Sequence, residues 1–191
     1  MNSRNGPPAG GGRLRSMDDT LSVKIIDLPG PRREAALPTL IDSFVGIYRW
    51  HAKRTLRTVS RVRAAVVGDE IVGVALLERL NSAVGYVYYL AVRSSYRRRG
   101  VGARLLDDAI EGFARSGVRV VYAAAEEENA ASIALFLSRG FRSVERRERG
   151  YLEGGLGAWG LRSRMWIVSG EVLLGRRLAP EPPASPAVES T

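Results

Sequence analysis

The spacing of hydrophobic residues along the chain first predicts strands. Residues 21–28 (LSVKIIDL) form a short apolar run that is typical of a strand. Apolar runs at 63–67 and 71–80 flank a Gly-Asp-Glu turn at 68–70, a pattern that predicts a β-hairpin. A further run at 84–92 (VGYVYYLAV) is rich in valine and tyrosine, which favour strands. Successive strands of this kind indicate an antiparallel meander.

Helical spacing dominates two other parts of the chain. Residues 32–57 predict a helical region, and we expect Pro38 to interrupt it because proline lacks an amide proton. Residues 101–113 carry an apolar residue at every fourth position, which predicts an amphipathic helix that Gly117 ends.

A buried strand and a capped helix are predicted further along. Residues 118–125 (VRVVYAAA) form a continuous apolar run. Because a helix separates this strand from 84–92, the two should be parallel neighbours joined by a right-handed crossover. Asn129 is placed to cap a helix that Gly140 closes. Together these elements predict an α/β or α+β fold with a mixed central sheet of about six to seven strands and helices on both faces.

The length of 191 residues fits one domain with tails, and we place that domain at residues 17–178. Both ends, 1–16 and 179–191, are rich in Pro, Gly, Ser and Ala, so we expect them to be disordered. No apolar run approaches the length of a membrane span, and the amino end lacks the apolar core of a secretory signal. We therefore expect a cytoplasmic protein with no membrane partner.

Composition narrows the possible chemistry. The chain has no cysteine, which excludes a disulfide framework, a thiolate zinc site and a cysteine nucleophile. Its single histidine, His51, cannot make a multi-histidine site, so we expect no metal. The formal net charge is +9, and 27 of the 29 basic residues are arginine. This excess is either a compositional habit or a preference for an anionic ligand.

A basic, glycine-containing turn at 93–100 leads directly into the helix at 101–113. Free backbone N–H groups at a helix N-terminus attract anions, and Gly100 and Gly102 let an anion approach the backbone closely. Three consecutive arginines at 97–99 add positive charge. The pattern predicts a phosphate site, although a plain tight turn among solvated arginines has the same composition.

Three motifs in order carry a resemblance to a known family. Residues 90–92 match Leu-x-Val, and Arg97, Gly100 and Gly102 match Arg/Gln-x-x-Gly-x-Gly/Ala. Residues 129–141 (NAASIALFLSRGF) resemble Asn-x-x-Ala-x-x-x-Tyr-x-x-x-Gly-Phe, with Phe136 at the tyrosine position. In these motifs the chain resembles the GNAT family, the Gcn5-related N-acetyltransferases, with an element order that agrees over most of its length. The resemblance implies a V-shaped splay between the fourth and fifth strands, and acetyl-CoA or another acyl-CoA as co-substrate.

The same resemblance assigns positions to the bound acyl-CoA. Backbone amides of the turn would hold the pyrophosphate, the pantetheine arm would pair with the fourth strand, and a backbone N–H near Leu90 would serve the thioester oxyanion. The assigned residues are Leu90, Ala91, Val92, Arg97, Arg98, Arg99, Gly100, Val101, Gly102, Ala103, Asn129 and Phe136.

The usual acid and base of the family are missing. The family commonly has a tyrosine as general acid where this chain has Phe136, and a glutamate base of its N-terminal acetyltransferases falls at Ala124. The catalytic candidates that remain are Tyr86, Tyr88, Glu126 and Tyr151. Each also has a plain structural explanation: the first two as strand formers, Glu126 as part of an acidic run before a helix, and Tyr151 as part of a glycine-rich insertion.

Three functions are compatible with the sequence, in descending order. The first is an N-acetyltransferase that moves an acetyl group from acetyl-CoA to a primary amine of a small molecule or protein. The second is a catalytically degenerate sensor or scaffold that binds acyl-CoA, motivated by Phe136 and Ala124. The third, a nucleic-acid binder, rests on charge alone, without a groove-reading helix or an aromatic–basic RNA signature. The resemblance also implies a possible homodimer through residues 164–178.

Overall fold

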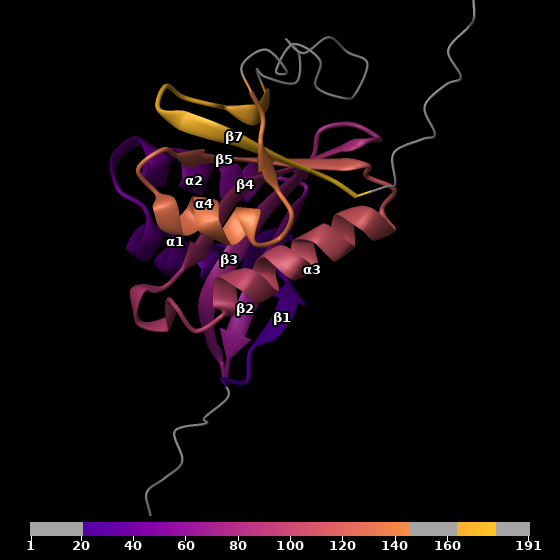
Figure 1. Ribbon diagram of the computed structural model, residues 1–191. Helices are drawn as coiled ribbons and strands as arrows, with labels where there is room; N and C mark the ends of the chain where they lie inside the picture. The colour runs from indigo at the N-terminus through magenta and orange to yellow at the C-terminus, as the bar shows by residue number, and fades with distance from the viewer. Residues whose placement is uncertain (1–20, 146–163, 179–191) are drawn as a thin grey trace, which may run out of the picture.

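The computed structural model describes residues 21–145 and 164–178, which contain a mixed sheet in the order β1-β2-β3-β4-β5-β7-β6 with helices on both faces (Figure 1). The strands are β1 (Lys24–Asp27), β2 (Arg61–Val67), β3 (Glu70–Arg79), β4 (Val84–Val92), β5 (Val120–Glu126), β6 (Arg142–Ser143) and β7 (Glu171–Arg177). The helices are η1 (Gly30–Ala36), α1 (Leu37–Ser43), α2 (Gly46–Thr58), η2 (Ser94–Tyr96), α3 (Val101–Arg115) and α4 (Ala130–Leu137). The predicted mixed sheet is confirmed. The predicted tails and Tyr151 lie outside the described residues.

The first four strands form the predicted antiparallel meander. The β2–β3 hairpin turns at Gly68, whose φ of 58° lies in the left-handed region that glycine adopts without strain. At the next turn, the side-chain oxygen of Asn81 accepts the N–H groups of Ala83 and Val84, both at 2.8 Å. Local turn chemistry therefore sets the order of these strands.

The parallel pairing of β4 with β5 is short. It runs from Val84 opposite Val120 to Val87 opposite Ala123 and then stops. Beyond that point β4 still pairs with β3, and β5 pairs along its length with β7. The two parallel strands therefore separate, which confirms the predicted splay, and the β5-facing edge of the second half of β4 is left without a strand partner.

An extra residue in β4 lies at this point of separation. Leu76 of β3 pairs with Tyr89 and Leu77 pairs with Val87, so Tyr88 has no partner and forms a β-bulge. The bulge breaks the alternation of side chains, because Tyr86 and Tyr89 both face away from α3 while Val87 faces it. Three tyrosines consequently gather on one side of the sheet.

Two helical layers cover the sheet (Figure 1). One face of the sheet packs on α3 and α4, and the opposite face packs on η1, α1 and α2. Strand β3 supplies both cores by alternation, with Ala75 and Leu77 facing α3, and Val74 and Leu76 facing α1 and α2. No helix in the described ranges is long and apolar enough to cross a membrane.

The helical region at 30–58 differs in detail from the prediction. Pro38 lies in the first turn of α1, where the missing amide proton costs no hydrogen bond, so the change there is only from a 3₁₀ helix to an α-helix. The true break comes at Phe44 and Val45, which are both extended. This break turns the Phe44 ring toward Tyr89, with ring centroids 4.9 Å apart.

Candidate active site

A long groove follows the open edge of β4. It has a volume of about 610 Å³ and is walled by the end of β4, the start of α3 and one side of α4. Most of the residues that the family resemblance assigns to acyl-CoA line this groove, including Leu90, Ala91 and Val92 on β4 and the stretch 100–103 at the start of α3. The splay of β4 and β5 is thus the structural cause of the groove.

The turn before α3 places backbone amides at one end of the groove. Gly100 is the N-cap of α3 with a φ of 79°, and Arg98 has a φ of 62°. The first amides of α3 have no carbonyl within the helix to bind, so they are available to an anion. The Nε–H of Arg97 donates to the Val92 carbonyl at 3.0 Å, whereas Arg99 stacks over Tyr96 and does not line the groove.

Gly102 lies close to side chains of both β4 and α4. A Cβ at this position would meet a Leu135 methyl at 3.3 Å and a Leu90 methyl at 3.4 Å. The three elements that wall the groove therefore approach one another at a residue without a side chain. A small side chain there contacts only flexible methyl groups, whereas a large one occupies the groove.

Two residues of the 129–141 motif lie at this site: Asn129 lines the groove, and Phe136 lines a smaller cavity beside it. The Oδ1 atom of Asn129 accepts the N–H of Ser132 at 3.0 Å and so caps α4, as predicted. Phe136 is only 3% exposed, with its ring edge-on to Phe141 at 5.0 Å. Phe136 therefore contributes to the apolar wall and supplies no proton.

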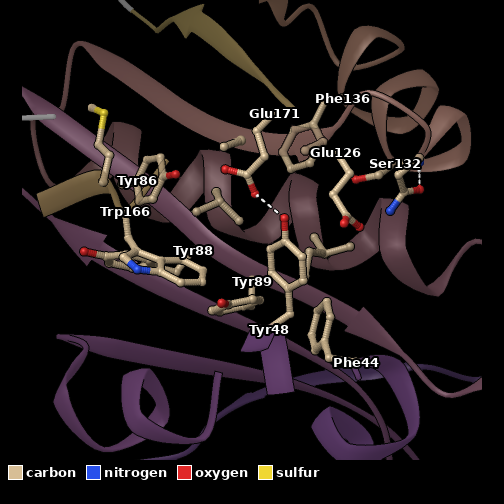
Figure 2. Close-up of a pocket in the computed structure, with 16 residues that line it drawn as sticks. Phe44, Tyr48, Tyr86, Tyr88, Tyr89, Glu126, Ser132, Phe136, Trp166 and Glu171 are labelled. Atoms are coloured by element: carbon tan, nitrogen blue, oxygen red, sulfur yellow. Dashed lines mark hydrogen bonds between the residues drawn. The ribbon is translucent and has the colours of Figure 1, made fainter. Parts of the chain in front are cut away.

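A second cavity of about 90 Å³ adjoins the groove on the other side of the opening (Figure 2). Phe44, Leu90, Asn129 and Ser132 line both spaces. The groove and the cavity are therefore neighbours at the splay between β4 and β5, and we refer to the two together as the passage.

Two carboxylates reach into this cavity from neighbouring strands. Glu126 ends β5 and Glu171 begins β7, and the two residues are directly opposite each other in the antiparallel ladder. The Tyr48 hydroxyl, from α2, donates to Oε1 of Glu171 at 3.3 Å, and the Val168 N–H donates to Oε2 at 2.9 Å. Figure 2 shows both carboxylates pointing toward the Tyr48 hydroxyl.

Burial raises the pKa values of Glu171 and Tyr48 in this cavity. The pKa of Glu171 is raised above its usual value, first by burial and also by the charge of Glu126, while hydrogen bonds from Val168 and Tyr48 oppose the rise. The pKa of the Tyr48 phenol is raised by burial and by the two carboxylates. The phenol therefore stays protonated at neutral pH and acts as a donor toward Glu171.

The tyrosines of β4 surround the same cavity. Tyr86 is 2% exposed and packs edge-on against Tyr88 at 4.8 Å, and the Tyr88 hydroxyl donates to the Arg164 carbonyl. Burial raises the pKa of both phenols. The phenols of Tyr86 and Tyr88 therefore lie at the cavity in their protonated form, and neither is suited to accept a proton.

The only histidine of the chain lies behind Tyr89. Its Nδ1 is 2.8 Å from the Tyr89 hydroxyl, and its ring stacks on Trp166 with centroids 3.7 Å apart. Trp166 itself has a left-handed backbone with a φ of 45°. The pKa of His51 is lowered by burial and by the charge of Arg54. His51 does not line the cavity; it contacts Tyr89 and Trp166, which do.

Glu126, which lines the cavity, was singled out from the sequence, but neither Glu171 nor Tyr48 was. The signal for Glu171 is its register. A glutamate at the start of the last long strand, opposite another glutamate, is a like-charge pair that a sheet normally avoids. That register depends on the pairing of β5 with β7, which no local pattern specifies.

Comparisons with known proteins agree with this geometry. Residues 25–141 match the family model described as the acetyltransferase (GNAT) family. This match covers more than half of the chain, and the protein therefore belongs to the GNAT family.

Among curated relatives, the N-alpha-acetyltransferase RimI of Mycobacterium tuberculosis is 37% identical over 98 residues, which are 50% of this chain and 60% of that protein. N-alpha-acetyltransferase 30 of Homo sapiens is 32% identical over 107 residues, which are 54% of this chain and 29% of that protein. The chain thus spans less than two thirds of the length of the curated relatives it matches.

Solved structures share the fold. The ribosomal-protein-S18-alanine N-acetyltransferase from Escherichia coli has a TM-score of 0.63 at 19% identity, covering 85% of this chain and 98% of that one. A GNAT family acetyltransferase from Elizabethkingia anophelis with acetyl-CoA bound has a TM-score of 0.58 at 16% identity, covering 81% and 97%. At these identities the likeness concerns the fold.

Proposed function

We propose that the protein is an N-acetyltransferase that moves the acetyl group of acetyl-CoA to a primary amine. The observation that carries the proposal is the passage at the splay of β4 and β5, with anion-binding amides at one end and two carboxylates at the other. Such a passage suits a reaction in which an anionic donor and a cationic acceptor approach from opposite sides. Family membership supports the same reaction class.

The donor end fits a nucleotide thioester. The amides at the start of α3 would hold the pyrophosphate, and the missing side chain of Gly102 leaves room for it. The unpaired edge of β4, from Tyr88 to Val92, would pair with the amide groups of the pantetheine arm as an added strand. A β5-facing N–H of this edge would then donate to the thioester oxygen as negative charge develops on it.

For the acceptor, we propose the α-amine of a peptide or protein. The relatives named as N-alpha-acetyltransferases support this choice, and the paired carboxylates favour an ammonium group in the cavity. A free small amine is the alternative that the same chemistry admits. A cytoplasmic location follows from this proposal, since acetyl-CoA and nascent protein chains are both found there.

The test combines binding with turnover. Purified protein is titrated with acetyl-CoA by calorimetry and then incubated with acetyl-CoA and a library of peptides and small amines, with detection of released thiol and of the acetylated product by mass. We expect saturable binding and acetylation of peptide α-amines. Gly102→Trp should weaken acetyl-CoA binding by at least about tenfold, because the indole occupies the groove.

Gly102→Ala is the matched control, since its Cβ contacts only movable methyl groups and should change the dissociation constant by less than about twofold. Normal binding to Gly102→Trp would show that the donor lies elsewhere. Tight binding of acetyl-CoA without turnover on any amine would instead identify an acyl-CoA-binding sensor and overturn the proposed activity.

A further inference from the structure

The acidic pair at the cavity has no cationic partner among the residues that the structure describes. Among residues 21–145 and 164–178, no arginine, lysine or histidine forms an ion pair with Glu126 or Glu171. The chain nevertheless carries a net charge of +9 and 27 arginines. Like charges directly opposite in a ladder are unfavourable, so two carboxylates side by side at a cavity wall favour the binding of a cation there.

Glu171 is held in one orientation by two donors from different parts of the fold. The Val168 N–H binds one carboxylate oxygen from the preceding turn, and the Tyr48 hydroxyl binds the other from α2. Glu171 is also the less exposed of the two carboxylates, whereas Glu126 is open to solvent. The carboxylate of Glu171 is therefore fixed and partly dehydrated, which is what a proton acceptor in a reaction requires.

The rest of the cavity wall is aromatic. Tyr48, Tyr86, Tyr89 and Trp166 line it together with Phe44. Aromatic faces stabilise an ammonium group and limit the water around it. The cavity as a whole thus presents two anions and several rings to an entering cation.

We infer that Glu171 is the general base of the proposed reaction, that Tyr48 positions its carboxylate, and that Glu126 opposite helps to bind the acceptor ammonium. This inference rests on the proposed function and assigns the base that Ala124 cannot supply. Glu171 takes over that role from a different strand, β7.

The reaction removes two protons from the acceptor ammonium. The Glu171 carboxylate takes one proton from the ammonium and later releases it to solvent. The freed nitrogen lone pair forms the C–N bond to the thioester carbonyl carbon, the C–S bond breaks, and its electron pair leaves on sulfur. The second proton lost by the nitrogen goes to that thiolate through water, because Phe136 has none to give. The products are an amide, the free thiol and one proton.

Other groups fit the role less well. The phenols around the cavity hold their protons more tightly than usual, so they do not accept one at neutral pH. His51 does not line the cavity and contacts Tyr89, which does. The raised pKa of Glu171 supports the geometric argument, because a carboxyl of raised pKa is a stronger base toward an ammonium.

The test is a pH profile of kcat/KM on a peptide α-amine, for the full chain and four variants. Glu171→Gln should lose about 100-fold or more at pH 6 and less than about tenfold near pH 9, where the amine with an unperturbed pKa near 8 is already deprotonated. Glu171→Asp should retain part of the activity. Tyr48→Phe should move the acidic limb of the profile to higher pH, because it removes a hydrogen bond that lowers the pKa of Glu171.

Glu127→Gln is the matched control, an exposed glutamate in the neighbouring acidic run, and should behave as the parent. An equal loss by Glu171→Gln at every pH, with acetyl-CoA binding intact, would overturn the assignment of Glu171 as the base. So would full activity of that variant. An inactive parent protein would instead count against the proposed function itself, so the two failures are distinguishable.

Discussion

Replacing Glu171 by glutamine should make the protein more stable at neutral pH while making it a poorer catalyst. Glutamine keeps the size and the hydrogen-bonding capacity of the side chain, so Val168 and Tyr48 retain a partner. The substitution removes one of the two negative charges that face each other at the end of the β5–β7 ladder. The variant therefore lacks the repulsion between these two carboxylates.

The size of the effect follows from the geometry. Two unit charges about 6 Å apart repel by roughly 0.7–1.4 kcal/mol at an effective dielectric constant of about 40–80, and cross-strand pairs fall in a similar range of about 0.2–1 kcal/mol. Part of this gain is lost with the charged hydrogen bond from Tyr48. We expect a net stabilisation of about 0.5–1 kcal/mol, or about 1–4 °C in melting temperature for a domain of this size.

The stability difference between Glu171→Gln and the parent protein should also depend on pH. The pKa of Glu171 is higher in the folded protein than in the unfolded chain, so the folded state keeps the proton to higher pH. Stability contributed by the protonated carboxyl is fully present below the unfolded pKa and is lost as the pH rises through the folded pKa. The advantage of Glu171→Gln should therefore vanish near pH 4 and reach its full value above neutrality.

Urea denaturation and thermal melts of the parent protein, Glu171→Gln and the control Glu128→Gln, between pH 4 and pH 8.5, measure this difference directly. Glu128 is exposed and outside the cavity, so its replacement should change stability little. A Glu171→Gln variant that is less stable than the parent at pH 8, or a difference that does not change with pH, would refute the electrostatic reasoning.

Two further substitutions test the elements that border the site, namely the cap of α4 and the packing of β4 against α3. Asn129→Ala should cost about 1 kcal/mol in urea denaturation, because it removes the cap of α4, whereas Asn129→Ser should retain most of the stability. Gly85→Ala should destabilise the folded protein by about 1–3 kcal/mol, since its Cβ would lie 2.7 Å from the ring of Phe113. Adding Phe113→Leu should recover part of that loss. An unchanged urea midpoint for Gly85→Ala alone would contradict the close packing.

The turn, helix and cap that border the groove could be predicted from the sequence because their signals are local. The turn with Gly100 and Gly102, the helix after it and the cap at Asn129 each depend on residues a few positions apart. The parallel pairing of β4 and β5 also followed, since an intervening helix leaves few other arrangements.

The acceptor half was not predictable because it depends on contacts between distant segments. Tyr48 and Glu171 are 123 positions apart, and their contact requires α2 to pack on the sheet and β7 to pair with β5. The bulge at Tyr88 is equally invisible in a run of valines and tyrosines, yet it decides on which side the tyrosines lie. Both features are set by tertiary packing, which local propensity does not describe.

The position of β7 between β5 and β6 has a consequence for how such a protein diversifies. All residues that line the groove fall within the family match at 25–141, whereas β7 brings Glu171 from beyond it. Mutations in β7 and in the turn before it can therefore alter the acceptor and the proton acceptor while the groove is inherited unchanged. Selection can act on the two ends of the passage separately, so new acceptors are open to evolution without rebuilding the donor site.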